Sequence, residues 1–149
     1  MLPFKRILCP TDFSEPSSRA FDVAAELASR FGAEVALVHV VSALPALPPD
    51  PNYLVRVPEY EQALHADAQR RLQKLADEIG KRGVKAHTVV GHGDAGSEIV
   101  RIGREEGVDL IVIATHGSTG LEHVLFGSVA ERVVRLAHCP VLSVRAPRP

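Results

Sequence analysis

The sequence predicts a single doubly wound α/β domain, in which a five-stranded parallel sheet carries helices on both faces. Short apolar runs alternate with segments of helical periodicity, which is typical of right-handed strand–helix–strand crossovers. The apolar runs are continuous rather than alternating, as in parallel strands that are buried on both faces. The length suits one hydrophobic core, so we expect residues 1–149 to form one domain without an internal repeat.

The first half of the chain contains two predicted strands and two predicted helices. The apolar run 6–9 ends at a proline and predicts the first strand. Apolar side chains then recur at helical spacing over 14–32, where a glycine stops the helix. The uninterrupted run 35–41 predicts a second strand, and we interpret the proline-rich stretch 43–58 as a long surface loop. Helical spacing returns over 64–79 and ends at two glycines.

The second half repeats the same alternation with shorter elements. Residues 84–90 predict a third strand, and 97–106 predict a helix whose isoleucines face inward. The apolar run 110–114 is the fourth strand. After a glycine-containing loop, 128–138 predict the last helix and 141–144 the last strand.

The composition excludes several classes of partner. A content of 46% hydrophobic and 23% charged residues is typical of a soluble globular protein. The formal net charge is −1 with acids and bases interspersed, so we expect binding neither to nucleic acid nor to an anionic membrane. No apolar run reaches the roughly 20 residues of a membrane span. The amino terminus lacks a signal-peptide layout, and Cys9 and Cys139 lie in apolar strand contexts, which favours a cytoplasmic protein with reduced thiols.

Four segments follow the carboxyl ends of predicted strands, where open α/β sheets bind their ligands. They are Pro10-Thr11-Asp12, Val40-Val41-Ser42, Gly91-His92-Gly93 and Ala114-Thr115-His116-Gly117. The last of them opens a loop that delivers Gly127 and Ser128 to the start of a helix, which is a natural site for an anion. The residues alone leave two interpretations open. Either the loop binds a phosphate, or Ser128 only caps the helix and the glycines only turn the chain.

Other patterns do not organise into a catalytic or metal site. Residues 91–96 match G-x-G-x-x-G, but no acid ends the next strand to meet a ribose. The seven histidines lack metal-ligand spacing, so we expect no metal site. We also find no nucleophile with its base, and the glycine loop carries no lysine or arginine to stabilise a transferring phosphoryl group. We therefore expect no catalytic residues, and at most slow hydrolysis of a bound triphosphate.

Three segments carry a family pattern: "ILCPTDFSE", "VALVHVV" and "LIVIATHGSTGLEHVLFGSVAERVVRLAHCPVLSV". In order and spacing they resemble the universal stress protein family over essentially the whole chain. The resemblance implies a Rossmann-like fold, similar to that of the adenine nucleotide alpha hydrolases. The ATP-binding branch of that family carries Gly, two residues, Gly, nine residues, then Gly followed by Ser or Thr. Gly117 and Gly127-Ser128 match the second part of this motif.

The resemblance implies an adenine nucleotide as ligand, ATP or AMP, with or without Mg²⁺. Pro10, Thr11 and Asp12 would line the ribose and adenine, with the Asp12 carboxylate accepting from ribose hydroxyls. Val40 would give the adenine an apolar wall and a backbone partner. His116 would either contact a phosphate or stay structural. The remaining residues of the phosphate side would be Ala114, Gly117, Gly127, Ser128 and Val129.

Departures from the family pattern leave alternatives open. Ala114 replaces the first motif glycine, Ser118 replaces a frequent basic residue, and Ala130 replaces a small hydroxyl residue. Asp12 also fits a capping box for the first helix, with Ser14 as a rival cap. We expect a stress-response or signalling module that binds nucleotide with little or no hydrolysis. The alternatives are a nucleotide-free scaffold that dimerises and binds partners, and a slow ATPase.

The last predicted strand indicates a homodimer. Val141 to Val144 is short, apolar and close to the carboxyl terminus, so we expect it to lie at an edge of the sheet. An exposed apolar edge invites pairing with a second copy. Members of the family that the chain resembles dimerise through this strand. The prolines of the tail would stop further strand addition because they lack an N–H group.

Overall fold

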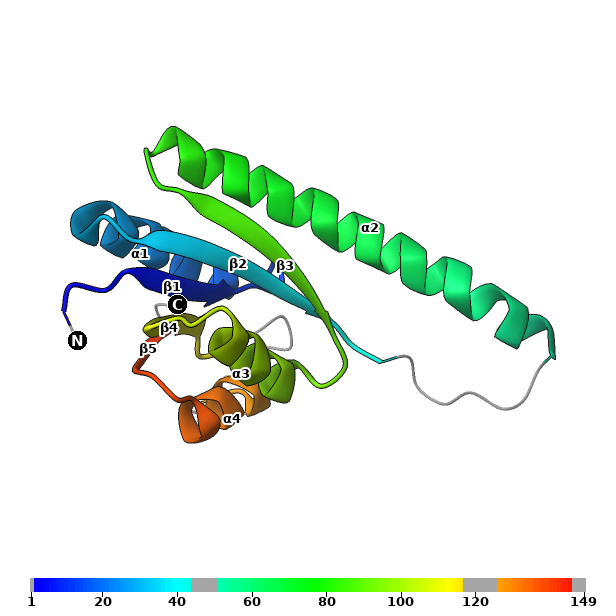
Figure 1. Ribbon diagram of the computed structural model, residues 1–149. Coiled ribbons are helices and arrows are strands. Elements are labelled where there is room, and N and C mark those ends of the chain that lie inside the picture. The colour runs from blue at the N-terminus through cyan, green and yellow to red at the C-terminus, as the bar shows by residue number, and fades with distance from the viewer. Residues whose placement is uncertain (1, 44–50, 117–125, 146–149) are drawn as a thin grey trace.

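The strands form one parallel five-stranded sheet, as the sequence predicts (Figure 1). The computed structural model describes residues 2–43, 51–116 and 126–145, with residues 51–56 described by their backbone only. The strand order is β3-β2-β1-β4-β5. The strands are β1 (Arg6–Pro10), β2 (Glu34–Val41), β3 (Ala86–His92), β4 (Leu110–Ala114) and β5 (Val141–Val144).

Helices cover both faces of the sheet, which confirms the predicted doubly wound architecture. In Figure 1, α1 and α2 lie on one side of the strands, and α3 and α4 lie on the other. No described helix is long and apolar enough to cross a membrane. The helices are α1 (Glu15–Phe31), α2 (Pro51–Lys81), α3 (Ala95–Glu105) and α4 (Ser128–Leu136).

Alternate side chains of each central strand enter different halves of the core. Ile7 and Cys9 of β1 pack among α1 and α2, whereas Leu8 between them packs among α3 and α4. All three are fully buried, which explains why β1 has a continuous apolar sequence rather than an alternating one. The same alternation holds in β4, where Val112 faces the first cluster and Ile111 the second.

The order in which the chain adds strands to the sheet reverses at β1. The chain passes from β1 to β2 and β3 on one side, and then crosses to β4 and β5 on the other. The register pairs Pro10 with Val38 and Leu8 with Ile111, so the carboxyl ends of β1, β2 and β4 meet at one edge of the sheet. An open α/β sheet binds ligands in the crevice at such a switch point.

The interpretation of 43–58 as a loop is wrong in its second part. α2 begins at Pro51 and continues through Pro58, whereas residues 44–50 lie outside the described part of the chain. Proline is favoured in the first turn of a helix, because the N–H that it lacks has no partner there. Inside the helix Pro58 removes one backbone hydrogen bond, but the long apolar face further along α2 packs on the sheet and sustains the helix.

The bounds of β3, α3 and α4 also differ from the prediction. The third strand runs over Ala86–His92 rather than 84–90, because the Val84 N–H still bonds the Ile79 carbonyl at the end of α2. α3 begins at Ala95, two residues before the predicted start, because Asp94 caps it and accepts from the Ser97 N–H. α4 ends at Leu136, because the next residue, Ala137, has an extended backbone with ψ 144°.

Candidate functional site

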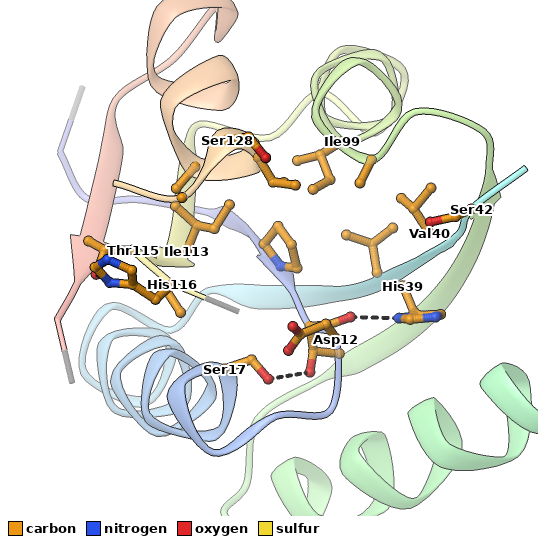
Figure 2. A pocket seen from close by; sticks show the side chains of 18 residues that line it. Asp12, Ser17, His39, Val40, Ser42, Ile99, Ile113, Thr115, His116 and Ser128 are labelled. Carbon is orange, nitrogen blue, oxygen red and sulfur yellow. Dashed lines mark hydrogen bonds between the residues drawn. The ribbon is translucent and has the colours of Figure 1, made fainter. Parts of the chain in front are cut away.

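A cavity of about 410 Å³ lies at the switch point, between the carboxyl ends of three strands and the first turns of α3 and α4 (Figure 2). Asp12 and Ser128 come from opposite sides of it in this view. Gly117, the tenth residue predicted for the site, lies outside the described part of the chain. The other nine predicted residues all line the cavity: Pro10, Thr11, Asp12, Val40, Ala114, His116, Gly127, Ser128 and Val129.

Several lining residues were not singled out from the sequence. Ile99 of α3 and Ile113 of β4 form part of an apolar wall with Val40. Their inward periodicity was visible, but the sequence gives no sign that α3 packs beside β2 and β3. His39 and Ser17 also reach the cavity, from β2 and α1. Val38 and Ala95 complete this group, while Ser42, Thr115 and Ala130, which were named from the sequence without being assigned to the site, also line the cavity.

Thr11, the first residue after β1, makes hydrogen bonds through its N–H, its carbonyl and its hydroxyl. Its N–H donates to the Val38 carbonyl at 2.8 Å, and its own carbonyl accepts from Nδ1 of His39 at 2.8 Å. The buried hydroxyl accepts from the Phe13 N–H at 3.0 Å and lies 3.1 Å from the hydroxyl of Ser17. Thr11 therefore shapes the turn between β1 and α1, which sets the position of Asp12.

The next residue, Phe13, has a strained backbone. Its φ is 63°, a left-handed conformation that is uncommon for a non-glycine residue. The Phe13 ring lies against the His39 ring at a centroid distance of 4.7 Å, and the guanidinium of Arg71 lies over it at 4.2 Å. Such strain costs of order 1–3 kcal/mol and persists only where the surroundings impose it. Contacts from β2 and α2 thus hold the turn that carries Asp12.

The structure decides between the two candidate caps of α1. Ser14 is the N-cap and accepts from the Ser17 N–H, so the capping-box interpretation of Asp12 is wrong. Oδ1 of Asp12 instead accepts from the Ser14 N–H at 3.0 Å and from the Ser14 hydroxyl. The Asp12 side chain is exposed and lies at the rim of the cavity. Its position suits a carboxylate that accepts hydrogen bonds from a ligand.

The start of α4 faces the cavity without a side-chain cap. The N-cap is Gly127, so the interpretation of Ser128 as the cap is wrong, and Ser128 is the first helical residue. The Gly127 N–H donates to the Thr115 carbonyl at 2.6 Å, and a Cβ at Gly127 would lie 3.2 Å from the same oxygen. Gly127 therefore allows the start of α4 to approach the end of β4 closely. Ser128 and Val129 line the cavity, and as residues of the first turn their N–H groups have no partner within the helix.

The cysteines and the metal-ligand residues do not form a reactive centre in the described part of the chain. Burial raises the pKa of the Cys9 thiol to about 12, so it is protonated at neutral pH. The half-buried Cys139 also has a raised pKa, mainly through burial and then through the charge of Asp109. Within residues 2–43, 51–116 and 126–145, no three side chains among His, Cys, Asp and Glu gather as metal ligands would.

A five-stranded doubly wound sheet with a crevice at its switch point defines the structural class of the protein. The chain belongs to the universal stress protein family, whose family model matches residues 3–145. It is 40% identical over 147 residues to universal stress protein MJ0531 of Methanocaldococcus jannaschii, covering 97% of this chain and 84% of that one. The solved structure of the hypothetical protein MJ0577 superposes with a TM-score of 0.82 at 31% identity, covering 97% and 98% of the two chains.

More distant solved structures share the fold and hold nucleotides. A universal stress protein of Archaeoglobus fulgidus was solved in complex with dAMP, with a TM-score of 0.66 at 23% identity and coverage of 96% and 98% of the two chains. A universal stress protein family protein of Arabidopsis thaliana was solved with AMP bound, with a TM-score of 0.69 at 22% identity and coverage of 96% and 92%.

Proposed function

We propose that the switch-point cavity binds an adenine nucleotide, ATP or AMP, and that the protein acts as a nucleotide-dependent stress-response module in the cytoplasm. One observation carries the proposal. The Asp12 carboxylate and the uncapped start of α4 face one cavity, with an apolar wall between them. A nucleotide needs these three features in one place: an acceptor for its ribose, donors for its phosphate and an apolar surface for its base.

Each side of the cavity has a proposed partner on the nucleotide. Asp12 accepts hydrogen bonds from the ribose hydroxyls, and Val40 packs against the adenine. The N–H groups of Ser128 and Val129 donate to phosphate oxygens, assisted by the Ser128 hydroxyl. The Gly127 N–H already bonds the Thr115 carbonyl, so in the proposed complex Gly127 brings the start of α4 close to β4 and does not donate to the ligand. Nucleotide complexes of distant family members support this proposal.

We further propose binding with little or no hydrolysis. The described residues of the lining include one carboxylate, Asp12, which is engaged by Ser14. The two imidazoles of the lining are also engaged, His39 with the Thr11 carbonyl and His116 with the Thr115 hydroxyl. General-base activation of a water needs a carboxylate or imidazole directed at the γ-phosphate, and phosphoryl transfer needs a cation beside it. Should Mg²⁺ accompany ATP, water and phosphate oxygens would complete most of its coordination. A single-turnover assay with Mg-ATP distinguishes the binding module from a slow ATPase.

The direct test of nucleotide binding is extraction of the purified protein under denaturing conditions. We expect adenine nucleotide in the extract, at a stoichiometry approaching one per chain. If the extract is empty, calorimetric titration with AMP and with Mg-ATP should still show binding. Absence of binding at millimolar concentrations of both ligands would contradict the proposal and favour the nucleotide-free scaffold.

The edge strand β5 supports a proposed homodimer. β5 is the last strand in the sheet order, and Leu142 is 40% exposed on it. The Ile111 N–H donates to the Pro140 carbonyl, and the Thr115 N–H donates to the Val144 carbonyl. Because alternate residues of a strand direct their polar groups to the same side, the Ser143 N–H points away from β4, toward the open edge. A second copy would pair there.

The substitution Ser143→Pro tests this edge pairing. Proline removes the outward N–H without removing a bond between β4 and β5, and prolines are tolerated on edge strands. We expect the variant to keep its fold and its nucleotide binding, while the dimer dissociation constant in sedimentation rises by about ten-fold or more. Ser143→Ala, which keeps the N–H, should remain dimeric. A Ser143→Pro protein that dimerises like the unsubstituted chain would place the interface elsewhere.

A further inference from the structure

The cavity is poor in positive charge. Among the described residues that line it, the ionisable side chains are Asp12, His39 and His116, with no lysine or arginine. His39 already donates from Nδ1 to the Thr11 carbonyl, and His116 lies 3.0 Å from the Thr115 hydroxyl through its own Nδ1. The sequence between β4 and α4, residues 117–125, contains one glutamate and neither lysine nor arginine. This segment therefore supplies no permanent cation.

The guanidinium group of α4 nearest in sequence to the cavity is directed toward α3. Nη1 of Arg132 lies 3.5 Å from the Asp94 carboxylate, which caps α3. The aliphatic stem of Arg132 packs on Gly96, where a Cβ would lie only 2.8 Å from its Cδ. Arg132 is thus engaged between the two helices. Its charge is offset by Asp94 and does not act as a phosphate clamp.

The positive potential for a phosphate then comes mainly from the start of α4. Aligned peptide dipoles give a helix start the equivalent of about half a positive charge, with a few N–H donors. A partial charge of this size, with these donors, can stabilise one phosphate group. Each further phosphoryl group adds roughly one negative charge, and here it would meet no cationic side chain among the described residues. Desolvating such a charge without a partner is unfavourable.

We propose that this cavity selects nucleotides with a single phosphate group over di- and triphosphates. The inference rests on the proposed nucleotide site and specifies its ligand class. Its physical cause is the charge balance of the lining, so it predicts a graded response to phosphate number. Anything that supplies positive charge near the start of α4 should reduce the selectivity, whether it comes from the solvent or from a substituted side chain.

The test is calorimetric titration of the nucleotide-stripped protein with AMP, ADP and ATP, first without divalent cation. We expect affinity to fall along this series, with AMP at least about ten-fold tighter than ATP, equivalent to roughly 1.4 kcal/mol. Adding Mg²⁺ should reduce the difference between the AMP and ATP affinities, because the cation neutralises charge on the additional phosphate groups of ATP. ATP binding as tightly as AMP without Mg²⁺ would overturn the selectivity but leave the nucleotide site standing. Failure of all three ligands would overturn both.

Two substitutions on α4 test the electrostatic cause. Val129 is the second residue of the helix, lines the cavity and is 37% exposed, whereas Val134 is 47% exposed and does not line it. Val129→Arg keeps the backbone N–H and adds a cation beside the proposed phosphates. We expect it to tighten ATP binding by about ten-fold and AMP binding by less. The matched variant Val134→Arg should leave the ATP-to-AMP ratio unchanged. The inference would be overturned if both variants changed the ATP-to-AMP affinity ratio equally, or if Val129→Arg left that ratio unchanged.

Discussion

Replacing Ser128 with proline is expected to abolish most nucleotide binding while leaving α4 folded. Ser128 is the first residue of the helix, a position where proline is favoured because its N–H has no partner within the helix. The preceding Gly127 has φ −68° and ψ 158°, an extended conformation that proline requires of the residue before it. The substitution therefore removes the proposed phosphate donor and hydroxyl without breaking the helix.

The expected loss is large because both lost groups bond a charged ligand. A hydrogen bond to a charged group contributes about 1.5–3 kcal/mol, so AMP affinity should fall by about ten- to a hundred-fold or more. Ser128→Ala keeps the N–H and should lose less. Calorimetry measures both affinities, and thermal unfolding should show both variants within a few degrees of the parent. AMP binding that survives Ser128→Pro would exclude the start of α4 as the phosphate site.

Local signals account for the part of the site that the sequence predicts. The turn after β1 and the glycine loop before α4 are each visible in a few consecutive residues, such as Pro10 to Asp12 and Gly127-Ser128. The rule that ligands bind at the carboxyl ends of parallel strands then brings them together. Nine of the ten predicted residues do line one cavity, although their contact with a ligand stays a prediction.

The parts that the sequence does not predict depend on tertiary contacts. Ile99 lines the cavity only because α3 packs against β2, β3 and α4, and this arrangement is absent from the linear pattern. Asp12 and Ser14 are both favourable caps, and the choice depends on where the Thr11 hydroxyl holds the turn. Likewise, the bond from the Gly127 N–H to the Thr115 carbonyl joins two segments whose approach only the fold determines.

Substituting alanine for Gly96 in α3 or for Gly80 in α2 is expected to change the free energy of unfolding with opposite signs. Gly96 is the second residue of α3, and a Cβ there would lie 2.9 Å from Cβ of Arg132 on α4. Because Cβ is fixed to the backbone, the helices must separate, and overpacking of this kind costs about 1–3 kcal/mol. Gly80 of α2 has open space where its Cβ would lie. Gly80→Ala should stabilise the protein by about 0.5–1 kcal/mol, through helix propensity alone.

The same pair of variants connects helix packing to the proposed site. α4 carries Ser128 and Val129 at its start, so displacing α4 from α3 moves the proposed phosphate donors relative to Asp12. Gly96→Ala should therefore weaken AMP binding as well as lower the free energy of unfolding, whereas Gly80→Ala should leave AMP binding unchanged. Denaturant unfolding and calorimetry on both proteins give the two quantities. A Gly96→Ala protein that is less stable but binds AMP normally would mean that the start of α4 does not determine affinity. A Gly96→Ala protein that is as stable as the parent would mean that α3 and α4 are not closely packed at this contact.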